Sequence, residues 1–328
     1  MERLTPVLAD LVASVLVRLP QGGLHRLAHV VGAGLYLARP ARRSLVRHNL
    51  RRVCSWLAAE GMATPRVAAA ARTDDALERL VRLAFGHYAR AYLEMLVAPA
   101  YSRRELLRRI HLETPETIVE ALGGSADDAR SDAQTAGGVG RVLVGLHLGS
   151  LELPALYVAM HSRRPVVTPM EELTNRALQG YVERSRSATG VIVVPSHSAR
   201  NLLRRTLRQG GTVALIADRP LASAAHQVTL FGAPARLPVG PALLALESGA
   251  ATYVGSVRRV GWGTYAARLQ RLPLPSEGSL RERRQVFMAA QIDAFQRLIA
   301  QAPEQWWTCF FRIWPDEPVA RRVRRAAA

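Results

Sequence analysis

Lysine is absent from this 328-residue chain, and cysteine is scarce. Cys54 and Cys309 are too few for a disulfide framework, and so little cysteine suits a reducing cytoplasm. The sequence also lacks His-Glu-x-x-His and Cys-x-x-Cys motifs, so it predicts no metal site. Because it contains neither a phosphate-binding glycine-rich loop nor a dinucleotide fingerprint, we expect no bound cofactor.

The charge of the chain is strongly one-sided. All 44 basic residues are arginine, against 26 acidic residues, which gives a formal net charge of +18. This balance suits an anionic partner such as a membrane surface, an acidic carrier protein or nucleic acid. An aromatic content of 6% and the lack of a known binding motif argue against nucleic acid. We therefore expect a protein that meets an anionic membrane surface and binds no nucleic acid. We also expect a monomer.

The first apolar segments predict helices that lie on a membrane. Residues 4–19 are interrupted by Asp10 and Arg18, and they are shorter than the roughly 20 residues needed to span a bilayer. Residues 24–38 are apolar and are followed at once by a cluster of arginines, which is typical of an interfacial helix. The alternative is a pair of core helices with a solvated basic end.

Strand and helix signals alternate along the second half of the chain. Strands are predicted at 165–168, 190–195, 212–217, 227–230, 252–260 and 264–268, and helices at 175–186, 199–209 and 280–300. Upstream lie a helix over 76–95, a short basic helix over 103–110 and a linker over 123–140. The pattern predicts an α/β fold with a mixed, mainly parallel sheet flanked by helices. We divide the chain into N-terminal helices (1–60), an α/β domain (61–318) and a basic tail (319–328).

The segment 141–160 predicts a strand, a sharp turn and a helix. Residues 141–146 form an apolar run that follows a glycine-rich loop, which is typical of a buried strand. Gly149 interrupts the run. Pro154 falls where the first turn of a helix tolerates a missing N–H, so residues 151–160 are predicted to be helical.

His147 and Glu152 flank this turn. Both side chains can point into the crevice outside the carboxyl end of the strand, where open α/β sheets usually bind their ligands. A carboxylate bonded to one imidazole nitrogen fixes the tautomer and stabilises the imidazolium. The pair therefore predicts a histidine general base oriented by Glu152. The alternative is a strand-end histidine beside an ordinary acidic residue at a helix N-terminus.

The sequence His147–Leu153 resembles the H-x4-[D/E] motif of the bacterial lipid A late acyltransferases and the related phosphatidylinositol mannoside acyltransferases. Further blocks resemble the family in the same order along the chain. They are Phe85–Glu94, Gly211–Arg219, Val228–Gly232, Leu237–Ala245 and Ala302–Trp307. The ordered set is specific for the family, although not for one substrate.

The resemblance implies a glycerol-phosphate acyltransferase-like fold and adds residues to the predicted site. Asp218 ends a predicted strand and belongs to the active site in the family; it could orient His147 or the acceptor, or simply cap the following turn. Arg184 or Arg186 occupies the place of a family arginine that suits a phosphate or an oxyanion, and the sequence does not decide between them. Pro220 stands where the family often has a second acidic residue, which puts a carboxylate pair in doubt.

The resemblance also implies the reaction, the transfer of a fatty acyl chain from a thioester to a hydroxyl of a membrane glycolipid. His147 would be the general base and Glu152 its orienting carboxylate. One of the two arginines and backbone N–H groups near Gly149 would stabilise the oxyanion. Because a thiol titrates at about 8.5, the thiolate leaves easily and no acyl-enzyme is needed.

Several alternatives stay open at this point. The donor is acyl-coenzyme A or acyl carrier protein, which is a co-substrate and not a cofactor. The favoured acceptor is a phosphatidylinositol mannoside-like glycolipid; a lipid A-type late acyltransferase that uses acyl carrier protein and a non-catalytic membrane-binding module are the other readings. We expect a peripheral or monotopic protein on the cytoplasmic face of the bacterial plasma membrane.

Overall fold

The architecture is that of a computed structural model, which describes residues 12–123, 140–162, 164–171, 179–180, 183, 186, 190–219 and 225–316. Some of the predictions fall wholly or partly outside these residues. They are Arg184, Pro220, most of the predicted helix over 175–186, most of the linker over 123–140, and the basic tail over 319–328.

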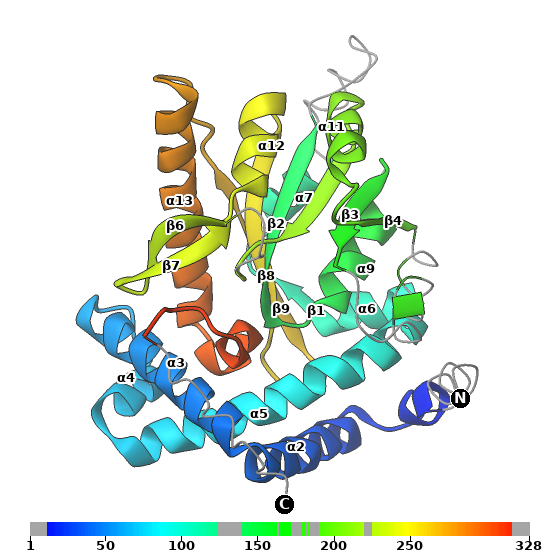
Figure 1. Cartoon of the computed structure of the whole chain (residues 1–328). Coiled ribbons are helices and arrows are strands. Elements are labelled where there is room, and N and C mark those ends of the chain that lie inside the picture. Colours follow the sequence, from blue (N-terminus) through cyan, green and yellow to red (C-terminus); the bar gives the residue numbers. More distant parts are fainter. Residues whose placement is uncertain are drawn as a thin grey trace, which may run out of the picture.

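A seven-stranded sheet forms the centre of the described part of the chain (Figure 1). Its strand order is β1-β9-β8-β2-β5-β3-β4, and neighbouring strands run parallel except β8 and β9. The strands are β1 (Ile110–Leu112), β2 (Arg141–Gly149), β3 (Val166–Met170), β4 (Val191–Pro195), β5 (Thr212–Ile216), β8 (Ala251–Arg259) and β9 (Tyr265–Leu272). The predicted mixed, mainly parallel sheet is confirmed.

Strand β2 lies in the interior of this sheet, between β5 and β8. Val142 and Val144 are buried, as expected for a parallel strand whose two faces are both covered by other elements. The strand does not end before His147, as predicted, but continues to Gly149. Its register with β8 shifts between Gly145 and Gly149, so the last residues pair with β8 again after an irregularity. This shift is a long-range pairing effect that the apolar pattern of one strand does not contain.

Helices cover both faces of the sheet and close its lower end (Figure 1). The helices are α2 (Gln21–Ala38), α3 (Pro40–Ala59), α4 (Pro65–Arg72), α5 (Asp74–Val97), α6 (Arg103–Arg109), α7 (Pro115–Ala121), α9 (Glu152–His161), α11 (Arg200–Arg208), α12 (Gly240–Ser248) and α13 (Leu280–Ala300), with 3-10 turns η1 (Ala98–Ala100), η2 (Pro303–Gln305) and η3 (Trp307–Phe310). Helix α13 has the predicted bounds, because a Ser279–Glu282 capping box fixes its start.

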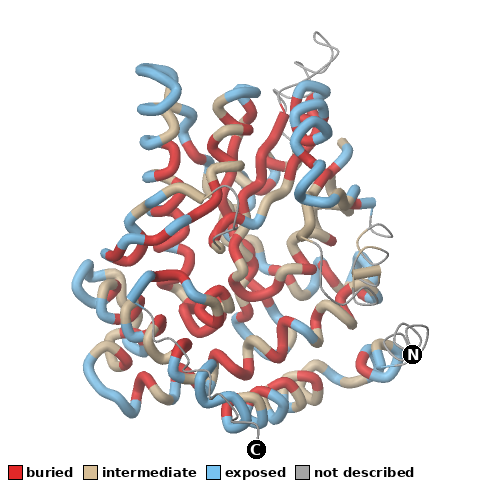
Figure 2. The backbone as a smooth tube through the Cα atoms, in the orientation of Figure 1, coloured by how far each residue is buried: buried red, intermediate tan, exposed pale blue. Residues whose placement is uncertain are grey.

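The N-terminal helices share one core with the sheet (Figure 2). Leu50 of α3 and Phe85 of α5 belong to the same buried cluster as Val144 of β2 and Trp306. Helices α2 and α5 approach very closely, since a Cβ on Gly32 would lie 2.6 Å from the backbone nitrogen of Gly86. Among the described residues, no helix is both long enough and apolar enough to cross a membrane.

A β-hairpin covers part of the face beside α13 (Figure 1). It consists of β6 (Ala225–Leu230) and β7 (Ala233–Pro238), which pair antiparallel. The sequence predicted β6 but not β7. Two prolines in six residues hide the signal of β7, and a two-stranded hairpin tolerates them because its outer edges need no ladder partners.

Candidate active site

His147 and Asp218 meet at the carboxyl edge of the sheet. Because β2 and β5 are parallel neighbours, the last residues of β2 lie beside the residues that follow β5. The Nδ1 atom of His147 lies 2.7 Å from Oδ1 of Asp218, and the backbone N–H of His147 donates to Oδ2 at 3.0 Å. The His147 side chain is 19% exposed and that of Asp218 is 2% exposed. The pair therefore presents the imidazole to solvent and keeps the carboxylate inside.

Two further donors hold the carboxylate of Asp218. The indole Nε1–H of Trp306 donates to Oδ2 at 2.7 Å, and the Thr308 hydroxyl donates to the same oxygen at 2.8 Å. Burial alone would raise the pKa of Asp218. The neighbouring His147 and the hydrogen bonds from His147, Trp306 and Thr308 outweigh burial and hold this pKa below its usual value.

The tautomer of His147 follows from the charge on Asp218. An ionised carboxylate only accepts hydrogen bonds, so Nδ1 of His147 must carry the proton in their contact. The other ring nitrogen, Nε2, is then the atom that can take a proton from a substrate. The Trp307 ring stands edge-on against the imidazole, with ring centroids 4.8 Å apart, and so restricts its rotation.

Glu152 engages an arginine at this edge. It lies in the first turn of α9, and its side chain is 6% exposed. Nη2 of Arg186 lies 2.8 Å from Oε1 of Glu152, and Nε lies 3.4 Å from Oε2, which is the forked geometry in which guanidinium groups bind carboxylates. The structure thus differs from the expectation that Glu152 orients His147. The carboxylate bonded to His147 is that of Asp218, and the carboxylate of Glu152 is bonded to Arg186.

Of the two candidate arginines, the structure places Arg186 at the site. Its Nη1 also lies 3.4 Å from the sulfur of Met170, at the end of β3. Arg184 lies outside the described residues, so only Arg186 can be compared with the arginine expected from the sequence.

Gly149 forms the turn that follows His147. Its φ of +69° is in the left-handed region, and a Cβ at this position would lie 2.2 Å from the Val257 carbonyl oxygen. The next N–H, that of Ser150, donates to the same carbonyl at 2.9 Å. A side chain at position 149 is therefore excluded on two grounds. The expected use of nearby N–H groups for an oxyanion stays a prediction.

A second ion pair stands next to Asp218. Arg219 pairs with Glu171, which follows β3, and its guanidinium lies 4.9 Å from the centre of the Phe311 ring. The site thus has an arginine–carboxylate pair beyond the one at Glu152.

Trp306, Thr308 and Arg219 are site residues that the sequence analysis did not assign. Trp306 and Arg219 stood inside blocks of the family resemblance, while Thr308 follows the last block directly. Their position in those blocks was the available signal. Trp306 and Thr308 contact a residue 88 and 90 positions away, and Arg219 pairs with a residue 48 positions away, which periodicity does not reveal.

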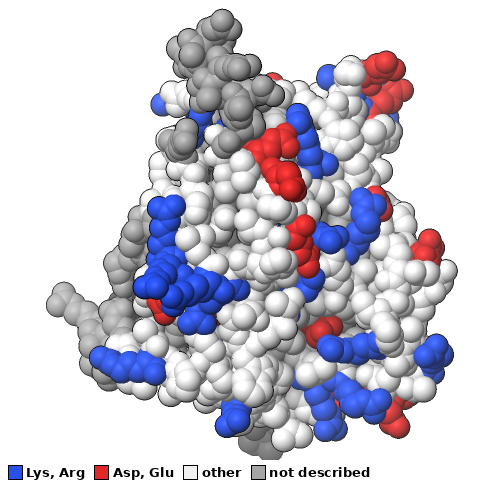
Figure 3. Space-filling model, turned by 180° about the vertical axis from the view of Figure 1, so that it is seen from behind, with Lys and Arg blue, Asp and Glu red and all other residues white. Residues whose placement is uncertain are grey.

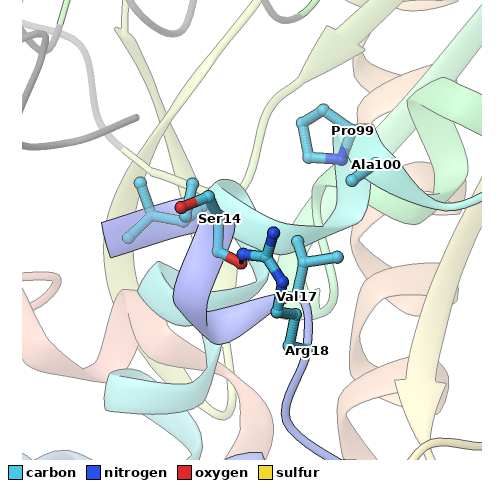
Figure 4. Close-up of a pocket in the computed structure, with 7 residues that line it drawn as sticks. Ser14, Val17, Arg18, Pro99 and Ala100 are labelled. Atoms are coloured by element: carbon cyan, nitrogen blue, oxygen red, sulfur yellow. Dashed lines mark hydrogen bonds between the residues drawn. The ribbon is translucent and has the colours of Figure 1, made fainter. Parts of the chain in front are cut away.

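A pocket of about 490 Å³ lies apart from these residues, between the first helical residues and the end of α5 (Figure 4). Its lining is Ala13, Ser14, Val17, Arg18, Leu96, Pro99 and Ala100. One wall, η1, also contacts α9, the helix that starts at Glu152. Among the described residues, no group of three or more histidine, cysteine or acidic side chains could hold a metal ion.

Comparison with known proteins identifies the family. The model of the family described as bacterial lipid A biosynthesis acyltransferase matches residues 7–314. The chain belongs to this family. The resemblance found in the sequence motifs is thereby confirmed, and the His147 motif lies within the matched residues.

Two mycobacterial members of the family are similar over part of their length. A phosphatidylinositol mannoside acyltransferase of Mycobacterium tuberculosis H37Rv is 30% identical over 168 residues, which are 50% of this chain and 49% of the relative. A protein of the same name from Mycolicibacterium smegmatis is 28% identical over 229 residues, 68% of this chain and 66% of the relative. The chain thus spans about half to two-thirds of the length of these relatives.

Proposed function

We propose that this protein is an O-acyltransferase that moves a fatty acyl chain from a thioester to a hydroxyl of a membrane glycolipid. The observation that carries the proposal is the His147–Asp218 pair at the carboxyl edge of the sheet, in a chain that belongs to an acyltransferase family. A histidine oriented by a buried carboxylate is suited to removing a proton from a hydroxyl at neutral pH.

The proposed reaction proceeds in two steps without an acyl-enzyme. Nε2 of His147 takes the proton of the acceptor hydroxyl while its oxygen attacks the thioester carbonyl, and Asp218 stabilises the imidazolium that forms. The carbon–sulfur bond then breaks, and the departing thiolate takes the proton back from Nε2. The products are an ester and a free thiol, and His147 returns to its starting state.

The oxyanion of the tetrahedral intermediate needs a positive group or N–H donors. Among the described arginines, Arg186 would supply this positive charge, because Glu152 fixes its guanidinium from one side. The N–H groups of His147 and Ser150 are already bonded to Asp218 and to the Val257 carbonyl, so Arg186 would be the main oxyanion donor. Arg219 would serve a phosphate of the substrates.

We further propose that the acceptor is a phosphatidylinositol mannoside-like glycolipid. Support comes from the names of the two mycobacterial relatives and from the all-arginine basic composition. Coenzyme A phosphates or an acidic acyl carrier protein would both suit the net charge of +18 as donor. A lipid A-type acceptor is the alternative, and the experiment below separates them.

The membrane would be met by the N-terminal helices and the loop after β8. Val30, Leu37 and Trp262 are exposed by 69%, 72% and 59%, and the guanidinium of Arg26 lies 6.0 Å from the centre of the Trp262 ring. Exposed apolar side chains beside arginines are typical of a surface that rests on anionic lipids. Basic side chains also gather in several groups on the face that is turned away from the viewer in Figure 1 (Figure 3). The mainly apolar pocket of Figure 4 is our candidate for the end of the acyl chain.

The test is an acyl-transfer assay with matched variants. Purified protein receives radiolabelled palmitoyl-coenzyme A and vesicles of total polar lipids from the source organism, and the lipids are then separated by chromatography. We expect one new labelled glycolipid, and His147→Gln should lower its rate by about 100- to 10,000-fold. His111→Gln, an exposed histidine of β1 away from the site, should leave the rate unchanged.

The outcomes separate the readings. Label that appears in a mannosylated phosphoinositide supports the proposed acceptor, and label in lipid A supports the alternative. Transfer only with acyl carrier protein as donor changes the co-substrate and leaves the reaction class intact. Transfer by His147→Gln at the wild-type rate, or no transfer with either donor, would overturn the proposed function.

A further inference from the structure

A fully buried ion-pair cluster lies directly behind the turn at Gly149. Its centre is Glu94 of α5, whose side chain is 1% exposed, and Arg259 of β8, whose side chain is 5% exposed. Arg259 binds Glu94 with a fork, from Nε to Oε1 at 2.8 Å and from Nη2 to Oε2 at 2.7 Å. Nη2 of Arg259 also donates to the carbonyl oxygen of Gly149 at 3.0 Å. One guanidinium therefore connects a buried carboxylate to the turn that follows His147.

The backbone of Arg259 reaches the other half of the site. Its N–H donates to Oε1 of Gln305 at 2.8 Å, and Nε2 of Gln305 donates back to its carbonyl oxygen at 2.8 Å. Gln305 directly precedes Trp306, which holds Asp218. The same residue thus fixes the backbone on the His147 side and the segment that carries the donors to Asp218.

Other members of the cluster hold Glu94 without reaching the site. Arg90 lies one helical turn before Glu94 and donates from Nε to Oε1 at 3.0 Å, and the Tyr265 hydroxyl donates to Oε1 at 2.7 Å. Burial alone would raise the pKa of Glu94, but Arg259 and Arg90 outweigh it and hold the pKa below its usual value. Glu94 is therefore a fixed anion on which Arg259 is oriented.

A buried ion-pair cluster is a costly way to stabilise a core. Two arginines and one glutamate must be taken out of water, and well-packed apolar residues often stabilise a core equally well. The forked Arg259 gives the turn something apolar residues do not, which is a rigid donor to the Gly149 carbonyl. A position error of about 1 Å in an active site can cost about 100-fold in rate.

We infer that Arg259, fixed by Glu94, is a positioning residue that holds the Gly149 turn and the Gln305–Thr308 segment so that His147 and Asp218 stay in register. The inference rests on the proposed function. It predicts that a change at Arg259 acts on the rate of the chemical step and on the His147–Asp218 contact. A change at Arg90 should act on stability, because the Arg259 fork and the Tyr265 hydroxyl still hold the Glu94 carboxylate and Arg90 makes no contact with the Gly149 turn.

The test compares Arg259→Lys with Arg90→Lys. Both variants keep a buried cation beside Glu94, but a lysine ammonium cannot fork to Glu94 and also reach the Gly149 carbonyl. We expect Arg259→Lys to lower kcat by about 100-fold with little change in KM, and Arg90→Lys to leave kcat near the wild-type value. Both should lower the melting temperature. Equal losses of kcat in the two variants, or a raised KM with unchanged kcat in Arg259→Lys, would overturn the inference.

A second readout does not depend on activity. Protein with isotope-labelled histidine is observed by nuclear magnetic resonance, and the His147 signals are assigned by their loss in His147→Gln. We expect the downfield Nδ1–H signal of His147 to shift or broaden in Arg259→Lys and to stay unchanged in Arg90→Lys. If wild-type protein transfers no acyl group, the proposed function fails, while this comparison still decides the positioning role.

A variant of Glu94 provides a second test in case Arg259→Lys does not fold. If Arg259→Lys does not fold, Glu94→Gln keeps the shape of the side chain and removes the charge that orients Arg259. Folded Glu94→Gln with a lowered kcat and a changed His147 signal supports the inference. Folded Glu94→Gln with wild-type kcat and an unchanged signal would overturn it.

Discussion

Asp218 and Glu152 stand at the same edge of the sheet and are almost equally buried, with side chains that are 2% and 6% exposed, yet they have different partners. Asp218 receives hydrogen bonds from His147, Trp306 and Thr308. Glu152 receives its bonds from Arg186. The role of a carboxylate in such a site thus depends on which donors reach it and not on its distance from the histidine in sequence.

Asp218→Asn should have the largest effect on acyl transfer. The amide keeps the shape of the side chain, but it is neutral and no longer requires a proton on Nδ1 of His147, so the imidazole loses its fixed tautomer. We expect kcat for acyl transfer to fall by about 1,000-fold with a folded protein. The measurement is steady-state acyl transfer together with a thermal melt, and a fall of less than tenfold would contradict the assignment.

Glu152→Gln should have a smaller effect. The substitution removes the charge that holds the Arg186 fork, and the guanidinium then loses its fixed direction. We expect kcat to fall by about tenfold, which corresponds to about 1.4 kcal/mol in the barrier. Arg186→Lys should give a similar loss in the same assay. A loss in Glu152→Gln larger than that in Asp218→Asn would make Glu152 the orienting carboxylate after all.

Thr308→Val tests a single hydrogen bond to Asp218. The side chains are nearly equal in size, and the change removes one hydroxyl donor from Oδ2 of Asp218. With fewer donors the pKa of Asp218 should rise, and we expect a loss of several-fold in kcat. Thr252→Val is the matched control, because that buried hydroxyl donates to the Ala250 carbonyl and not to the site. Equal losses in the two variants would show that the Asp218 bond has no special role.

The smallest expected effect of Asp218 is on how the free energy of unfolding depends on pH. Its folded pKa is lowered, so its contribution is fully present above the unfolded pKa of about 3.9 and is lost as pH falls through the folded value. Glu94 acts in the same direction, and the difference between wild type and Asp218→Asn isolates Asp218. Urea unfolding between pH 3 and pH 7 should show a shallower acid slope for the variant. Parallel slopes would contradict the lowered pKa.

The sequence predicts the framework of the fold better than the contacts of the site. Residues 212–217 and 280–300 were predicted closely because their patterns are local, and β5 and α13 occupy them. The bonds to Asp218 join residues 71, 88 and 90 positions apart, so no local spacing encodes them. The H-x4-E spacing pointed to His147 and Glu152, but β2 continues past His147, and in the structure Glu152 is paired with Arg186 while His147 is bonded to Asp218.

The Arg259 cluster shows a second limit of sequence reading. Glu94 ended a block of the family resemblance, but the sequence analysis gave it no role. Its partner Arg259 is 165 residues away, in a chain that contains 44 arginines. Only the folded chain shows which of these arginines is buried against a carboxylate and aimed at the Gly149 carbonyl.

A double-mutant cycle on His147 and Asp218 tests the central claim most directly. If Asp218 acts through His147, Asp218→Asn should cost about 1,000-fold in wild type and almost nothing in a His147→Gln background, because the two residues work as one unit. The residual acyl-transfer rates of His147→Gln and of the double variant should then agree. A further large loss in the double variant would show that Asp218 acts independently, and it would contradict the account.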